Sequence, residues 1–557
     1  MRLGRWGYAA GYLVLSLVVV GSLWVIPYLP TNDGPEWVFA THVENHYADP
    51  GTPYGAAFEP ALQYASRGFA IVYDPLEAWL GWQRGLQAAL SVIVCVVGWG
   101  FVALVRAIDP RRLALGFLGF PLALSWSLYM GFWSFVVATG FGLFTLALAV
   151  QMGRPTWRGR AALAGLLLLV AISHVFGAVL AGLAVLCLLV ARAKPDDRLA
   201  EVGRVALIGL PAAGILACAT LTAHQPGAQV ATEPFSYLPW RHAAAVLPRT
   251  LVPGPLLRAL LVTAAVSSAA CLAAVRARRA DTSASDRGLA VAAVILLAAS
   301  VAMPIHVPGW WFFSQRFLPL GATLALAVVP LERAPAGARR LVPAGLFGCA
   351  LLWAVPTYAF HHRLAATCAD AVRGLSAGVH RSTEVLALPL DWTESPDHDL
   401  LHAEVPMMKP LLHMGALYAT VEGGLTPLSF GTGAATYPFT QRPHRVAVPP
   451  AILDLEHYWA VFRSDPFRND PDYRHATEDR LASLGAHYEG VVLLAARPDD
   501  LALWRRRGYV PDWEQGKTLI AHFAPSLQAV GAGASSPPLR RAADRVASDP
   551  PASVAPR

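Results

Sequence analysis

The stretch YAAGYLVLSLVVVGSLWVIPYLPTNDGPEWVFATHVENHYADPG, residues 8–51, contains the pattern that decides the fold. Its first half, Tyr8–Tyr28, is an uncharged apolar run of the length that crosses a bilayer as a helix. Its second half, Thr31–Gly51, collects carboxylates and histidines directly after that run. Arg2 and Arg5 precede the run and no convincing small-residue cleavage site follows it, so we expect an uncleaved first membrane span. Acidic groups gathered beside uncharged spans predict that the protein works at that membrane surface.

Composition excludes an ordinary soluble protein. Of 557 residues, 55% are hydrophobic and only 15% are charged. The net charge of +7 does not indicate nucleic-acid binding, because the basic residues stand in short clusters between apolar runs, as topology signals do. The six cysteines contain no CxxC pair, and five of them lie in or beside apolar runs. They predict small core residues, with neither a disulfide framework nor a cysteine zinc site.

Residues 8–360 contain about eleven apolar runs long enough to cross or nearly cross a bilayer. We place them at Tyr8–Tyr28, Leu86–Val105, Leu113–Leu128, Trp133–Gln151, Ala161–Ser173, Phe176–Val190, Val205–Thr222, Leu256–Val275, Leu289–Met303, Phe317–Leu331 and Leu341–Phe360. The stretch 161–190 is too long for one span and short for two, and we divide it at His174. The expected fold class is an all-α polytopic membrane bundle in residues 1–360, followed by an extracytoplasmic α/β domain.

The positive charges assign the two sides of the membrane. When the connections alternate, one side receives 19 Lys and Arg residues and the other, up to Phe360, receives 6. The positive-inside rule places the richer side, with the N-terminus, in the cytoplasm. Merging the two runs around His174 would reverse the later sides and spoil this separation. The long loop 29–85 and the tail from His361 are therefore expected outside the cytoplasm. The Ala- and Arg-rich composition is compatible with a GC-rich bacterial genome, and the expected location is the inner membrane.

A soluble domain is expected in residues 361–527. Strand-like runs at Glu384–Leu390 and Gly490–Ala495, a helix-like stretch at Pro498–Arg507 and a strand-like run at Lys517–Phe523 predict a small α/β domain. The glycines of HMGALYATVEGGLTP, residues 413–427, indicate a turn, and DWTESPDHDLLHAE, residues 391–404, is typical of a solvated loop. Residues 528–557 are rich in Ala, Ser, Pro and Arg, and we expect them to be disordered.

The first loop contains two candidate catalytic carboxylates, Asp33 and Glu36. Pro35 suits the first position of a helix and Asp33 or Asn32 suits the cap before it, so Glu36 would lie in the first turn. Held beside the membrane surface, the two carboxylates can accept a proton from a sugar hydroxyl or hold a divalent cation. The alternative is helix capping with a solvated first turn.

His42 and His46 are candidate metal ligands on the same predicted helix. Their i, i+4 spacing places both rings on one helical face. A third ligand would have to come from Asp33, Glu36 or Asp49. The alternative is an interfacial helix with polar and aromatic edges.

Candidate substrate-binding residues lie in the other outer connections. His174 is expected at the outer turn between two runs. Arg316, in PGWWFFSQRF (residues 308–317), can hold a phosphate through its planar guanidinium, and Trp310 and Trp311 can stack on a sugar or an isoprenoid chain. Arg241 is a second candidate for an anion contact. The alternatives are a structural histidine with its hydrogen bonds satisfied, and an aromatic belt with a snorkelling arginine.

This layout resembles the GT-C superfamily of integral-membrane glycosyltransferases. The resemblance covers nearly the whole chain as architecture, and its motif-like part is Asp33 with Glu36. It implies transfer of a sugar from a polyprenyl-phosphate carrier to an extracytoplasmic acceptor, with the role of catalytic base or metal ligand falling to Asp33. This chain departs from the common pattern of two adjacent acids, because Gly34 and Pro35 intervene.

The cofactor expected with this chemistry is a divalent cation, Mg²⁺ or Mn²⁺. A nucleotide cofactor is not expected, since the sequence has no Walker or GxGxxG motif. The expected partners are a polyprenyl-phosphate sugar, the bilayer and an acceptor that the sequence does not identify. The rival functions are a lipid or oligosaccharide transporter, and a catalytically silent scaffold of the same shape for envelope polymer assembly. A transporter is disfavoured because the runs contain no ionisable residue at mid-membrane and no related halves.

Overall fold

The computed structural model describes residues 5–61, 65–152, 156–222, 235–307, 310–375, 377, 384–390, 404–427, 429, 437–442 and 470–524. The loop expected at residues 391–404, except for Glu404, and the tail expected to be disordered, residues 528–557, lie outside these ranges.

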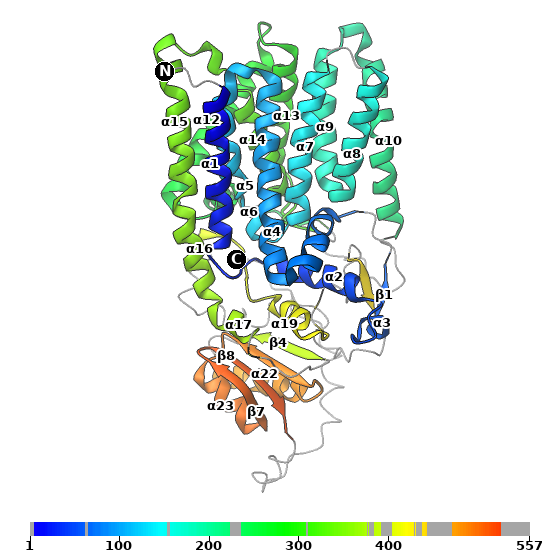
Figure 1. The fold of residues 1–557 in the computed structure, drawn as a ribbon, viewed down its shortest axis with the longest axis vertical. Coiled ribbons are helices and arrows are strands. Elements are labelled where there is room, and N and C mark those ends of the chain that lie inside the picture. Colours follow the sequence, from blue (N-terminus) through cyan, green and yellow to red (C-terminus); the bar gives the residue numbers. More distant parts are fainter. Residues whose placement is uncertain are drawn as a thin grey trace.

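A bundle of apolar helices forms one half of the molecule, and the first loop and the C-terminal part form the other (Figure 1). Nine helical stretches of the described residues are long and apolar enough to cross a membrane, so the chain is a multi-pass membrane protein. The bundle contains α1 (Arg5–Trp24), α4 (Gly68–Ile108), α7 (Trp133–Gln151), α8 (Trp157–Ser173), α9 (Val175–Arg192), α10 (Arg198–Thr222), α12 (Leu256–Arg278), α13 (Ala284–Ala302), α14 (Leu318–Ala327), α15 (Ala336–Ala354) and α16 (Pro356–Thr367). The all-α polytopic bundle expected from the sequence is confirmed.

The division of residues 161–190 at His174 is also confirmed. Helix α8 ends at Ser173 and α9 begins at Val175, and His174 between them has an extended backbone, with φ −165° and ψ 123°. The two runs are therefore separate helices joined by a one-residue turn.

The third predicted span, Leu113–Leu128, is wrong as a continuous helix. The chain there forms a 3₁₀ helix, η1 (Pro110–Leu118), and two short helices, α5 (Gly119–Ala123) and α6 (Trp126–Tyr129). Gly119 lies so close to α4 that a Cβ would come 2.9 Å from Phe101, and Pro121 has no backbone N–H to continue a helix. The segment still runs between the two ends of the bundle: Arg112 pairs with Asp286 in the first turn of α13, and the Tyr129 carbonyl accepts a hydrogen bond from the first loop.

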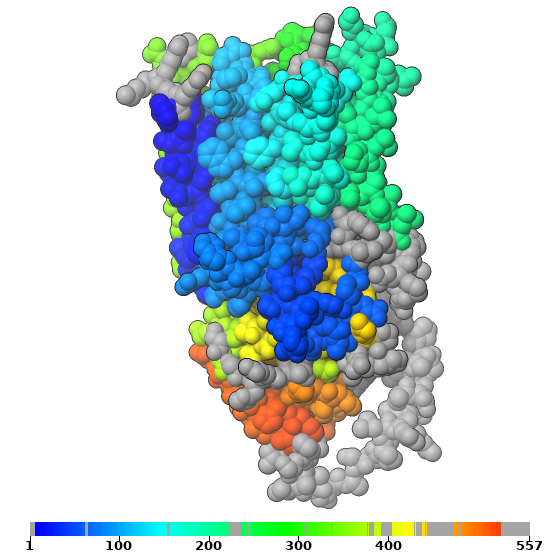
Figure 2. All heavy atoms as spheres, turned by 45° about the vertical axis from the view of Figure 1, so that its right-hand side comes forward, coloured from blue at the N-terminus to red at the C-terminus, as the bar shows by residue number. Residues whose placement is uncertain are grey.

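The first loop folds as helices against the end of the bundle. It forms α2 (Gly34–His46), α3 (Tyr54–Ala57), the strand β1 (Phe58–Pro60) and the first part of α4, up to Gly81. Gly81 has φ +74°, a conformation that breaks the helix and lets the apolar second part of α4 enter the bundle. Figure 2 shows these segments in blue, between the bundle and the C-terminal part.

The C-terminal part contains a four-stranded sheet of order β4-β6-β8-β7, in which only β4 and β6 are parallel. Its elements are α17 (Ala369–Gly374), β4 (Val385–Pro389), α19 (Met414–Glu422), β5 (Phe439–Gln441), α22 (Pro471–Gly485), β6 (Gly490–Leu494), α23 (Pro498–Arg506), β7 (Tyr509–Gln515) and β8 (Thr518–Phe523). All three strand-like runs and the helix-like stretch of the sequence are thus confirmed. Strand β7 was not expected, because Pro511 and the polar residues Asp512, Glu514 and Gln515 interrupt its apolar residues.

Two further links join the first loop to the C-terminal part. Strand β1 pairs antiparallel with β5, and Phe39 and Val43 of α2 pack with Ala416 of α19 and Phe439 of β5 in one buried cluster. Because α2 is held on one side by this cluster and on the other by the bundle, its N-terminal end lies where the three parts meet. The N-terminus of the chain lies at the opposite end of the bundle (Figure 1).

Candidate functional site

Helix α2 begins at the junction of the bundle and the outer parts, as the sequence predicts, but Asp33 does not cap it. Asp33 occupies the N-cap position and Pro35 the first turn, yet the Asp33 side chain makes no capping hydrogen bond. Its Oδ1 accepts instead from the Asn32 side chain at 2.6 Å. The Asn32 oxygen in turn accepts from the backbone N–H of Lys409 at 2.9 Å. The Asp33 carboxylate, with a side chain 18% exposed, is therefore oriented for contacts outside the helix.

Glu36 lies one turn further on and is fully buried. Its Oε1 lies 3.2 Å from Nδ1 of His413, and its Oε2 accepts a hydrogen bond of 3.1 Å from the Tyr437 hydroxyl. The other ring nitrogen of His413, Nε2, lies 3.7 Å from Oδ1 of Asp33. His413 thus stands between the two carboxylates, and the stretch predicted from its glycines to be a turn supplies a residue of the site.

The start of α2 is fixed against the loop that precedes α7. The backbone N–H groups of Asn32 and Asp33 donate to the carbonyls of Tyr129 and Met130, at 3.1 and 3.0 Å. Gly131, with φ +78°, lies so close that a Cβ there would collide with the backbone of Gly34. These backbone contacts restrict the position of the Asp33 backbone at the start of α2.

Arg316 and His174 meet on the bundle side of this junction. Nη1 of Arg316 lies 3.3 Å from Nε2 of His174. A guanidinium can only donate, so this nitrogen accepts and the His174 ring is neutral with its proton on Nδ1. The pKa of His174 is accordingly well below its ordinary value, because the ring is buried and faces a positive charge.

An aromatic wall surrounds the arginine. The guanidinium carbon of Arg316 lies 4.2 Å from the ring centre of Phe132 and 5.6 Å from that of Trp310. Trp310 also packs edge-on against His174, with ring centres 5.9 Å apart. Trp311 is 41% exposed and packs against His306, with ring centres 4.3 Å apart and ring planes tilted by 40°. Of the predicted tryptophan pair, one therefore lines the arginine and the other faces outward.

Electrostatic coupling joins the two halves of the site. Burial raises the pKa of Asp33, interactions with His413, Asn32 and Arg316 lower it, and Glu36 raises it further. Arg316 is thus close enough to influence Asp33. A small cavity inside the bundle is lined by Ser125, Ser127, Phe135, Thr139, Pro319 and Thr323, among others. Of these, Phe135 has its ring centre 5.9 Å from the guanidinium carbon of Arg316.

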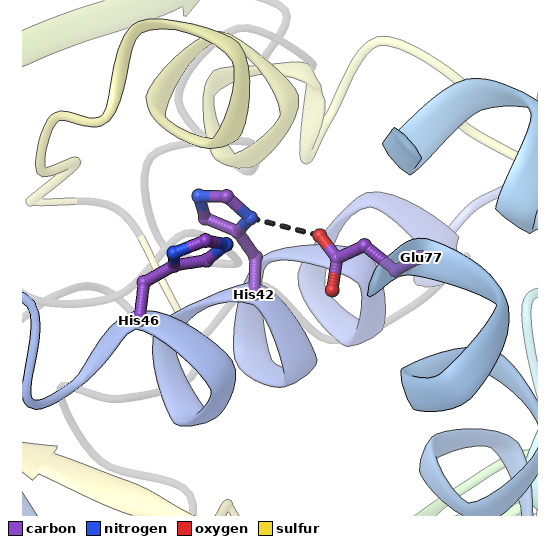
Figure 3. Close-up of side chains that lie close together, drawn as sticks. All are labelled: His42, His46 and Glu77. Carbon is purple, nitrogen blue, oxygen red and sulfur yellow. Dashed lines mark hydrogen bonds and ion pairs between the residues drawn. The ribbon is translucent and has the colours of Figure 1, made fainter. Parts of the chain in front are cut away.

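Two groups of predicted residues lie elsewhere. Arg241 is exposed in the first turn of α11 (Trp240–Leu251), and its role in anion binding stays a prediction. His42 and His46 lie further along α2 and share one face, as expected. The group that joins them is Glu77 of α4, rather than Asp33, Glu36 or Asp49 as expected (Figure 3).

The residues that sequence reasoning missed come from distant parts of the chain. His413 and Tyr437 lie about 400 positions from Glu36, at separations of 377 and 401 residues. A single sequence contains no signal for such pairings. Asn32 stood beside a recognised acid, and its side-chain amide was a signal that could have been used.

No protein-family model matches the chain, and no curated protein matches it in sequence. Solved structures do match. The crystal structure of ArnT from Cupriavidus metallidurans in the apo state aligns with a TM-score of 0.55 at 14% identity, over 93% of this chain and 99% of that one. The same protein bound to undecaprenyl phosphate aligns with a TM-score of 0.54, also at 14% identity, over 94% and 99% of the two chains.

These alignments span the bundle, the first loop and the C-terminal part together. At such low identity they establish the fold and leave the chemistry of the site to its own residues. The resemblance inferred from the sequence is confirmed at the level of the fold, which this chain shares with ArnT.

Proposed function

We propose that this chain is a membrane glycosyltransferase that moves a sugar from a polyprenyl-phosphate carrier to a hydroxyl group of an acceptor outside the cytoplasm. The observation that carries the proposal is the placement of Asp33. Its carboxylate lies at the start of α2 without capping the helix, and it lies beside His413. The charge of Arg316 is near enough to lower its pKa. The fold supports it, and the ArnT structure was solved with undecaprenyl phosphate bound.

In the proposed reaction the acceptor oxygen attacks the anomeric carbon of the donor sugar. The bond between that carbon and the phosphate oxygen breaks, and the carrier leaves as polyprenyl phosphate. Asp33 accepts the proton of the acceptor hydroxyl, the work of a general base. Burial, which raises its pKa, makes it a stronger base than an ordinary aspartate.

Arg316 is the group we assign to the phosphate. Its guanidinium is partly buried in an aromatic wall, where charge-assisted hydrogen bonds to a phosphate are strong. The neutral His174 accepts from Nη1 and so holds the orientation of the guanidinium. Trp310, packed on both residues, closes the site against water on one side.

Glu36, His413 and Tyr437 are positioning residues in this proposal. Glu36 is buried and its carboxylate oxygens face His413 and Tyr437, so His413 presents Nε2 toward Asp33. The C-terminal part of the chain thereby completes the site that the first loop begins.

The test is transfer by the purified, membrane-reconstituted protein from a radiolabelled undecaprenyl-phosphate sugar, with a panel of pentose and hexose donors and envelope-lipid and glycan acceptors. Asp33→Asn is expected to lower the transfer rate by about 10²–10⁴-fold, the usual contribution of a general base, without changing the melting temperature. Asp470→Asn is the matched control, because Asp470 does cap its helix, α22, and lies in the distal part of the chain. Wild-type protein that releases no sugar from any donor, or an Asp33→Asn variant as active as wild type, would contradict the proposal.

A further inference from the structure

His42, His46 and Glu77 form a cluster of potential metal ligands away from Asp33 and Arg316. The two histidines occupy successive turns of α2 and Glu77 comes from the first part of α4 (Figure 3). One ligand atom from each residue lies within 4.8 Å of the others. We propose that this cluster binds a zinc ion, which fastens α2 to α4.

The ligand geometry is close to what zinc requires. The ring centres of His42 and His46 are 4.4 Å apart, and Nδ1 of His42 lies 2.8 Å from Oε1 of Glu77. Four-coordinate zinc holds nitrogen and oxygen ligands at about 2.0–2.2 Å, so its ligand atoms are about 3.4 Å from one another. Small rotations of the three side chains would bring the ligand atoms to that spacing, with the ion replacing the hydrogen bond between His42 and Glu77.

The residues around the cluster orient its ligands. Glu77 is 6% exposed, and its second oxygen accepts a 2.7 Å hydrogen bond from the Asn45 side chain, which fixes the carboxylate and leaves Oε1 for an ion. Tyr54 packs edge-on against His42, and its hydroxyl is buried with no hydrogen-bond partner among the described residues. A water molecule on the fourth position of the ion can satisfy that hydroxyl.

The ligand types favour a transition metal over Mg²⁺ and Ca²⁺. Two imidazoles and one carboxylate suit zinc, whereas Mg²⁺ and Ca²⁺ prefer oxygen ligands alone. With three protein ligands, the fourth position would be taken by water. The Mg²⁺ or Mn²⁺ expected from the sequence stays a prediction for the carboxylates near Asp33, and the histidine cluster is a separate site.

Three protein ligands and a water are the coordination typical of catalytic zinc, but the location of the cluster, away from Asp33 and Arg316, indicates a structural role. Helix α2 carries Asp33 and Glu36 at its beginning and the two histidines at its end. Arg67, the residue before α4, already forms an ion pair with Glu44 of α2. A metal ion would add a second connection between the two helices. Zinc would then stabilise the loop on which the carboxylates stand, whichever reaction they perform.

The experiment uses the full-length protein in detergent, freed of any histidine tag and stripped with a chelator. Competition with a chromophoric zinc chelator is expected to show one ion per chain, and zinc is expected to raise the melting temperature. His46→Ala, at a ligand 42% exposed and so tolerant of truncation, is expected to weaken binding by at least about 10–100-fold, the loss known for outer-shell partners alone, and to remove the thermal shift. Asn45→Ala is expected to weaken binding within that same range.

His475→Ala is the matched control, since His475 is an exposed histidine of α22 outside the cluster. It is expected to bind zinc as wild type does. Zinc bound equally well by wild type and His46→Ala, or no zinc bound at stoichiometric concentration, would overturn the proposal. Both readouts are independent of sugar transfer, so a failure of the proposed reaction would leave this result unaffected.

Discussion

At the scale of single residues, Asp33 is exposed to opposing electrostatic influences, and each can be removed by one substitution. Burial and the Glu36 carboxylate raise its pKa, while Arg316 and His413 lower it. A base works only when deprotonated, so transfer is expected to fall as the pH drops through this raised pKa, at a less acidic pH than for an ordinary aspartate.

Substitutions of the neighbouring charges should therefore move the acidic limb of the pH profile in opposite directions. Glu36→Gln removes a negative charge and should lower the pKa of Asp33, which shifts the limb of kcat/KM to lower pH. Arg316→Gln removes a positive charge and should shift it to higher pH, besides raising KM for the phosphate-bearing donor. The measurement is kcat/KM against pH for the three proteins. Limbs that coincide, or move in the same direction, would separate Asp33 from the titrating group.

At the scale of elements, the site depends on how closely the loop before α7 approaches the start of α2. Gly131 has φ +78° and its missing Cβ would point at the backbone of Gly34. Gly131→Ala is expected to cost about 1–3 kcal/mol for the left-handed conformation alone, with the steric collision added. The displaced loop would carry Asp33 away from Arg316.

Thermal unfolding in detergent and the transfer assay together test that expectation, with a lower melting temperature and a transfer rate reduced at least tenfold as the expected outcome. Gly165→Ala in α8 is the control, because nothing lies within 4 Å of its missing Cβ and alanine favours a helix. If Gly131→Ala melted and reacted like the control, the close approach would not be what positions the carboxylate.

The same elements show how far the sequence could be read. Of the eleven predicted spans, ten correspond to helices of the bundle, and the strand-like runs predicted β4, β6 and β8. Both kinds of signal are local in the sequence. The segment 113–128 has the hydrophobicity of a span, but Gly119 packs closely against α4 and Pro121 has no backbone N–H to continue a helix. Composition alone does not distinguish these two uses of an apolar run.

For the site, the sequence located both members of the contact between Arg316 and His174, but only one member of each contact with the C-terminal part. Asp33, His174 and Arg316 were recognised because an acid after the first span, a histidine between apolar runs and an arginine at the outer entrance to its span are unusual in such a chain. His413, which contacts Asp33 and Glu36, Tyr437, which contacts Glu36, and Glu77, which contacts His42, reach these residues through tertiary packing. These contacts span 35 residues for His42 with Glu77 and up to 401 residues for Glu36 with Tyr437, and they leave no trace in the local sequence pattern.

At the scale of the whole molecule, charge is divided between the two ends of the bundle. The end that holds the start of α1 also holds a buried network in which Arg112 pairs with Asp286 and Glu332, at 2.7 Å each, and Arg276 pairs with Asp286. The Asp33 site and the four-stranded sheet lie at the other end (Figure 1). Because the basic clusters of the sequence follow the same division, the positive-inside rule predicts that the site faces away from the cytoplasm.

Topology reporters joined after Ala524, at the end of β8, test this orientation directly. Alkaline phosphatase folds only in the periplasm and green fluorescent protein exported through the general secretory pathway stays dark, so the expected result is an active phosphatase fusion and a non-fluorescent second fusion. Fusions at the connection between α9 and α10, near Lys194, should give the reverse, since that connection lies on the basic side. A fluorescent C-terminal fusion would put Asp33 in the cytoplasm. A carrier whose sugar is presented outside would then be out of its reach.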